Sequence, residues 1–182
     1  MRGRVRFRVV PRAFRSQDDD ELRAAERTVT QALGDLPLDF QALLAVSNIF
    51  RAATAARVHL ERTVLSEHRL SWSAFVTVFV LRVWGDLESR QLAEEVGVTP
   101  GTLSGVVDTL ERRGFVRRAP HTTDGRRVVV KATAKGRKAL DSILVRFNEE
   151  EMFITNELSG AERAELARLL RRVLRTLDAA DA

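Results

Sequence analysis

The chain has no cysteine among its 182 residues. This absence excludes disulfides, thiolate metal sites and cysteine-based peroxide sensing, and it fits a reducing compartment. The longest strongly apolar stretch, around Ala74 to Leu81, is far too short to span a bilayer. No apolar segment follows the arginines near the N-terminus, so a secretory signal is not expected. These absences predict a soluble, cytoplasmic protein that has no membrane partner.

The residue sets of metal sites and active sites are also missing. The three histidines, His59, His68 and His121, lack the spacing and the carboxylate neighbours of a metal site. No nucleophile is paired with a base, and no glycine-rich phosphate loop is present. We therefore expect a protein that is not an enzyme and that needs no metal or other cofactor.

Positive charge is concentrated in one segment of the chain. The formal net charge is +5, yet between Thr99 and Lys138 ten lysines and arginines stand against three carboxylates. The rest of the chain is about neutral to slightly acidic. A basic segment on a neutral body is typical of a protein that binds a polyanion, although a solvated charged face is the common alternative.

The N-terminal part of the chain is predicted to be an arm followed by helices, and the C-terminal part is predicted to be helical. Residues 1–20 form a basic, disordered arm with arginines ahead of an acidic run, namely Arg2, Arg4, Arg6, Arg8, Arg12 and Arg15. Residues 21–66 carry N-terminal helices, about Asp20 to Leu33 and Asp39 to Leu65. Residues 137–182 carry C-terminal helices, the last of which begins with the capping-box pattern Ser159 to Glu162. We assign both helical regions to dimerisation.

Residues 67–136 are predicted to form a separate lobe in which the hydrophobic period changes. Ser71 caps a helix from Trp72 to Trp84, and a short helix follows from Arg90 to Val96. Thr99 caps a third helix, with Pro100 at its first position and an apolar stripe of Leu103, Val106, Val107 and Leu110. After Gly114 come two strands, Phe115 to Ala119 and Arg126 to Ala132, joined by the polar turn from Pro120 to Gly125.

The order of these elements indicates a winged helix-turn-helix. Ala93, Gly97, Leu103 and Val106 follow the spacing at which a small residue lets two helices cross, glycine makes the turn and apolar residues seat the second helix. The predicted fold class is therefore mainly α with a small β-hairpin, a winged helix-turn-helix lobe on a helical dimerisation scaffold.

At these positions the sequence resembles the MarR family of bacterial transcription regulators. The resemblance covers about residues 39–178 and rests on Leu92, Ala93, Gly97, Val98, Thr99, Leu103, Val107, Asp108, Leu110, Glu111, Gly114, Phe115, Val116, Arg118, Asp124, Gly125, Arg126, Thr133 and Gly136. It implies a homodimer with DNA-reading lobes, dimer contacts from both chain ends and a small-molecule effector. Gly105, Thr109, Gly125 and Ala132 depart from the family pattern, the first three at positions that are often basic.

The expected DNA-binding residues follow from this reading. Small polar residues at the start of the third lobe helix are placed to reach bases, phosphates or thymine methyls, and the helix N-terminus favours phosphate. The hairpin supplies the cations. The expected set is Thr99, Gly101, Thr102, Ser104, Arg118, Asp124, Arg126 and Arg127.

Two of the hairpin assignments have alternatives. Arg126 and Arg127 are candidates for a minor-groove or phosphate contact, and an ion pair between Arg126 and Asp124 that shapes the hairpin is equally compatible with the sequence. Arg118 is assigned to DNA, with ordinary solvation of a strand residue as its alternative.

An effector pocket is expected at the junction of the lobe with the dimer helices, where the resemblance places it. The candidate residues are His68, Trp72, Phe75 and Phe79, and the effector would be phenolic or lipophilic. Aromatic residues at helical spacing are more often ordinary core, so that alternative stays open.

Together these features predict a sequence-specific, double-stranded-DNA-binding regulator. We expect a repressor that binds a pseudo-palindromic operator as a homodimer. The alternative is a winged-helix module that contacts another protein instead of DNA. The slim residues Gly105 and Thr109 favour that alternative, and the basic hairpin argues against it.

Overall fold

A computed structural model describes residues 19–120 and 128–180. It divides the chain into two units, Met1–Arg62 and Thr63–Ala182, and each unit is presented by itself. None of the helices in the described part of the chain is both long enough and apolar enough to cross a membrane.

From residue 19 onward, the first unit contains the helices α1 (Asp19–Ala32) and α2 (Phe40–Leu60). Asp39 caps α2, because its carboxylate accepts a hydrogen bond of 3.0 Å from the amide of Ala42. The two helices are linked by Glu26 of α1, whose carboxylate accepts hydrogen bonds of 3.0 Å from Asn48 and Arg51 of α2. Both predicted helices are confirmed in position.

The end of the second helix differs from the expectation. An uninterrupted α-helix from Asp39 to Leu65 was predicted, whereas the last five residues, Glu61–Leu65, form a π-helical turn. Such a turn has a wider hydrogen-bonding pattern than the α-helix, and Val64 and Leu65 in it are fully buried.

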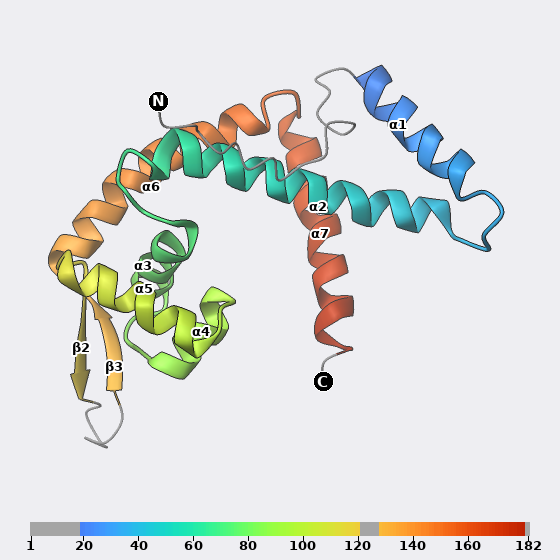
Figure 1. Cartoon of the computed structure of the whole chain (residues 1–182). Coiled ribbons are helices and arrows are strands. Elements are labelled where there is room, and N and C mark those ends of the chain that lie inside the picture. The colour runs from blue at the N-terminus through green and yellow to red at the C-terminus, as the bar shows by residue number, and fades with distance from the viewer. Residues whose placement is uncertain (1–18, 121–127, 181–182) are drawn as a thin grey trace, which may run out of the picture. The chain divides into compact units, whose positions relative to one another are not determined.

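The second unit is a helical lobe with a small sheet, followed by two more helices (Figure 1). Its elements in chain order are α3 (Trp72–Val83), β1 (Leu87–Glu88), α4 (Ser89–Val96), α5 (Pro100–Arg112), β2 (Val116–Pro120), β3 (Val128–Ala132), α6 (Ala134–Ile154) and α7 (Gly160–Asp178). Side-chain hydroxyls cap the starts of four helices, at Ser71, Thr99, Thr133 and Ser159. The caps at Ser71, Thr99 and Ser159 were predicted. The capping box between Ser159 and Glu162 is present.

The core of the lobe is built from the apolar stripe of α5 and its neighbours. Leu103, Val107 and Leu110 are at most 2% exposed, whereas Val106 is only half-buried. Burial of each such side chain contributes about 1.5–3 kcal/mol. Other fully buried members include Leu92, Val116, Val130, Leu140 and Ile143.

The sheet has three antiparallel strands in the order β1-β3-β2. Two strands were predicted, and both are confirmed within two residues of their predicted starts. The third, β1, was not expected. It pairs Leu87 with Val130 and Glu88 with Val129, and two residues are too few to show an alternating pattern.

Gly114 ends α5 in the left-handed conformation, with φ of 70°. The amide of Phe115 donates a hydrogen bond of 2.9 Å to the carbonyl of Leu110, and the amide of Gly114 donates one of 2.8 Å to the carbonyl of Glu111. This pair of bonds is a Schellman motif, in which the glycine position requires positive φ. The chain therefore turns sharply from α5 into β2, which places the strand beside the helix.

Candidate nucleic-acid interface

The N-terminus of α5 is set by a threonine cap. The Thr99 hydroxyl accepts a hydrogen bond of 3.2 Å from the amide of Thr102, and the two threonine hydroxyls lie 2.9 Å apart. Pro100 occupies the first turn, where an amide hydrogen is not needed. The other free amides and the positive end of the helix dipole favour an anion at this position.

The exposed face of the first half of α5 carries only small residues. Gly101, Thr102, Ser104 and Gly105 are all exposed. A Cβ atom built on Gly101 or Gly105 would meet nothing within 4 Å, so no packing within the described chain requires glycine there. This side of the helix is slim enough to enter a major groove, which is about 12 Å wide.

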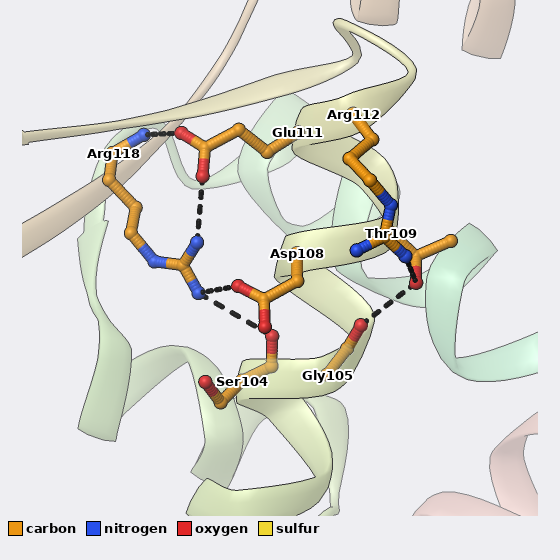
Figure 2. A network of polar contacts seen from close by, with 7 residues as sticks. All are labelled: Ser104, Gly105, Asp108, Thr109, Glu111, Arg112 and Arg118. Atoms are coloured by element: carbon orange, nitrogen blue, oxygen red, sulfur yellow. Dashed lines mark hydrogen bonds and ion pairs between the residues drawn. The ribbon is translucent and has the colours of Figure 1, made fainter.

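The second half of α5 carries two carboxylates that are held by the wing. The guanidinium of Arg118, on β2, lies 2.7 Å from Asp108 and 2.7 Å from Glu111. The same group donates a longer hydrogen bond of 3.4 Å to the carbonyl of Ser104, and the Arg118 amide donates to Glu111 at 2.8 Å. Figure 2 shows these four contacts running from the strand along one side of the helix. We call Arg118, Asp108, Glu111 and the Ser104 carbonyl the clasp.

The clasp lowers the pKa of Glu111. The backbone amide of Arg118 is the main cause, followed by the hydrogen bond from its side chain, because both stabilise the carboxylate form. The side chain of Arg118 is 30% exposed, so it is neither a solvated strand residue nor a fully buried one.

The C-terminal end of α5 is bonded to two further segments. Arg113 donates to the backbone carbonyls of His68 and Arg69, at 2.8 and 2.9 Å, and its guanidinium lies 4.5 Å from the ring centre of Phe115. Lys135 of α6 donates to the carbonyl of Arg113 at 2.7 Å. This end of the helix is therefore fixed to the turn before α3 and to the first turn of α6.

The strands of the wing place their cations on two faces. Arg117 is exposed and follows the alternation of the strand, so it points away from the face that carries Arg118. Lys131, its partner on β3, is bonded to Asp86. Asp124, Arg126 and Arg127 lie outside the described residues, as does the ion pair considered between Asp124 and Arg126.

The expected effector residues are brought together only in part. Phe75 contacts three rings: its centroid is 6.2 Å from that of Trp72, 6.2 Å from that of Phe79 and 4.6 Å from that of Phe147 on α6. Phe75 is buried, and the space beside it leaves no room for a water molecule. His68 contributes its backbone carbonyl to Arg113. This packing favours the core alternative, and the effector pocket stays a prediction.

The small face of α5 was predicted from the sequence, whereas the clasp and the bonds of Arg113 to the turn before α3 were not. Asp108 and Glu111 are three residues apart and so lie on one side of a helix, which was the available signal. Which cation they would meet depends on the long-range pairing of helix and strand. In residues 19–120 and 128–180 no group of histidines and carboxylates could hold a metal ion.

Comparison with known proteins adds to this geometry. A model of the MarR family matches residues 70–128, the segment from α3 to the first residue of β3. The HTH-type transcriptional regulator YwaE of Bacillus subtilis is 35% identical over 162 residues, which cover 87% of this chain and 95% of that protein. The HTH-type transcriptional repressor NicR of Pseudomonas putida is 26% identical, over 71% of this chain and 82% of that protein.

A solved structure shares the fold. A mutant MarR from E. coli, crystallised with operator DNA, superposes with a TM-score of 0.64 over 74% of this chain and 96% of that chain. The sequence identity is 23%.

Proposed function

The chain belongs to the MarR family of HTH-type transcription regulators, and on that premise we propose that it is a homodimeric repressor of bacterial genes. It acts in the cytoplasm by binding a pseudo-palindromic operator sequence-specifically in double-stranded DNA. The regulators it resembles act on transcription, and no feature of the described residues calls for catalysis.

The exposed N-terminal half of α5 carries this proposal. Its capped end presents free backbone amides, and its exposed residues Gly101, Thr102, Ser104 and Gly105 include no side chain larger than threonine. The backbone can therefore approach bases and phosphates closely, with Thr99, Thr102 and Ser104 as the hydroxyls within reach. The wing would add Asp124, Arg126 and Arg127, where an arginine would enter the minor groove or bind phosphate.

An uncovered apolar face on α7 supports the homodimer. The helix has no buried residue. Five of its apolar side chains are more than 40% exposed: Leu166, Leu169, Val173, Leu174 and Leu177. A contiguous stripe of this kind is costly in water, since burying one such side chain contributes about 1.5–3 kcal/mol. Met152 and Phe153 at the end of α6 are exposed as well. A second copy of the chain would cover these residues.

Two copies also explain the form of the expected operator. A two-fold dimer carries two copies of α5, and each copy reads one half-site. Helix-turn-helix dimers bind half-sites about one helical turn, or 10 bp, apart. Repression follows if the occupied site overlaps a promoter, and the similarity to the repressor NicR supports that sign of regulation.

The DNA proposal is tested by fluorescence anisotropy with labelled duplexes. Purified protein is titrated, at physiological salt, into the DNA upstream of its own gene and into unrelated DNA of the same length. The expected preference for the upstream DNA is at least about a thousandfold. Equal, weak binding to both duplexes would contradict sequence-specific recognition. No binding to either would favour the alternative module that contacts protein.

The dimer proposal is tested by light scattering at micromolar concentration. The wild-type protein should have twice the mass of one chain, which is 20.5 kDa. Leu174→Glu places a charge on the apolar face and should yield monomers that bind the operator weakly. Arg171→Glu, on the same helix and also exposed, is the matched control and should remain dimeric. A monomeric wild type would contradict this part of the proposal.

A further inference from the structure

Arg118 joins two elements that are both expected to meet DNA. Its side chain extends from β2 and contacts α5 at three residues, Ser104, Asp108 and Glu111. These positions are four and three residues apart, so they form one line along a single side of the helix. One strand residue therefore bonds nearly two turns of α5 (Figure 2).

The backbone of Arg118 takes part as well. In the sheet order β1-β3-β2, the strand β2 lies at an edge, so half of its amides have no strand partner. The Arg118 amide finds its acceptor in the Glu111 carboxylate at 2.8 Å. Glu111 thus binds the backbone and the side chain of one residue, which fixes the position of the strand along the helix.

The guanidinium is directed at the protein. Its two terminal nitrogens bond the carboxylates of Asp108 and Glu111 at 2.7 Å each. The charge of Arg118 is therefore opposed by two negative charges on the same side of α5. A phosphate would have to compete with both carboxylates for it.

We propose that Arg118 is a positioning residue of the DNA-reading surface, which holds α5 at a fixed register against the wing strand, and that it does not bind phosphate itself. This inference rests on the proposed function. It reassigns a residue that the sequence pattern placed among the DNA contacts, because the two carboxylates and the Ser104 carbonyl bond both terminal nitrogens of its guanidinium.

Two substitutions of opposite charge separate the two roles of Arg118. Arg118→Met removes a positive charge and Asp108→Asn removes a negative one, and each removes the ion pair between Arg118 and Asp108. If the clasp positions α5, both variants lose about tenfold in the ratio of operator affinity to affinity for unrelated DNA. The double variant loses no more than Arg118→Met alone, because that variant already lacks the ion pair that Asp108→Asn removes.

A direct phosphate contact gives the opposite pattern. Arg118→Met would then weaken binding to both duplexes equally and reduce the slope of log K against log salt by about 0.9. Asp108→Asn would strengthen binding, because a negative charge near DNA is gone. Arg118→Lys would restore affinity in that case, whereas lysine cannot bond two carboxylates and a carbonyl in the geometry of the arginine fork. This pattern would overturn the inference.

Arg117→Met is the matched control. It removes the same charge from the same strand, on the face that points away from the clasp. Its ratio of operator to unrelated affinity should stay within about twofold of the wild type. The clasp residues are partly exposed, so the variants should fold, with melting temperatures lowered by no more than about 4 °C.

Hydrogen exchange on the full-length protein without DNA closes the test. Arg118→Met and Asp108→Asn should speed exchange of the amides of β2 and of the second half of α5, whereas Arg117→Met should not. If the wild type shows no operator preference, the proposed function fails, and the exchange data still judge the clasp. If exchange in all three variants equals that of the wild type, the positioning role is refuted.

Discussion

The two halves of α5 differ in what they touch. The N-terminal half presents Gly101 and Gly105 to open space. The C-terminal half is bonded to β2 through Arg118, to the turn before α3 through Arg113 and to α6 through Lys135. A helix that is anchored firmly at one end can keep its other end exposed without losing its orientation. The C-terminal half of α5 therefore holds the helix in place, whereas the N-terminal half is available to a ligand.

The largest effect on stability is expected at Gly136, in the first turn of α6 beside the anchored end. A Cβ atom on this residue would lie 2.0 Å from the carbonyl oxygen of Phe115, and backbone atoms cannot move aside as a side chain can. Gly136→Ala should lower the free energy of unfolding by about 3 kcal/mol or more. The free energy of unfolding is measured by urea denaturation, with circular dichroism as the signal. A loss below about 1 kcal/mol would show that the backbone at Phe115 can shift to accommodate the methyl group.

Arg113 should give the next largest effect. Its guanidinium bonds two backbone carbonyls and lies over the ring of Phe115. Arg113→Met leaves both acceptors without this donor and should lower the free energy of unfolding by about 2 kcal/mol. Arg112→Met is the control, since Arg112 is exposed and bonds Thr109 of its own helix. Equal melting temperatures for the two variants would argue against an anchored end.

Thr99 should show a smaller effect on stability and a separate effect on binding. Thr99→Ala removes the cap of α5 and should cost about 1 kcal/mol of unfolding free energy. Operator affinity should fall further than affinity for unrelated DNA, because the helix start is the part proposed to read bases. Thr99→Ser keeps the capping oxygen and should restore the stability. If it does not, the hydroxyl is not what stabilises this end.

The features that the sequence predicts best are those coded by neighbouring residues. The caps at Ser71, Thr99 and Ser159 depend on contacts three residues apart, and so they are readable from a short window. The strand β1 was missed because its two residues, Leu87 and Glu88, are defined by pairing with β3, some forty positions later. The π-helical turn at Glu61–Leu65 has no distinctive local pattern in this sequence.

The same distinction applies to the site. The small, exposed face of α5 was predicted, since helical spacing alone tells which residues lie opposite the apolar stripe. The clasp was not, because Arg118 and Asp108 meet only after β2 folds against α5. The aromatic residues Trp72 and Phe75 were offered as a pocket, but Phe147, from a helix seventy residues away, stacks on Phe75. Sequence spacing gives the face of a helix but not what covers it.

Gly105→Glu tests the central claim most directly, that the free face of α5 binds DNA. The new side chain enters open space, and glutamate favours helix over glycine, so the free energy of unfolding should stay equal or rise by up to about 1 kcal/mol. A negative charge against the phosphates should nevertheless lower operator affinity by at least about thirtyfold. Gly105→Gln, of the same size and without the charge, separates repulsion from bulk. A Gly105→Glu protein that binds the operator as tightly as the wild type would contradict the account.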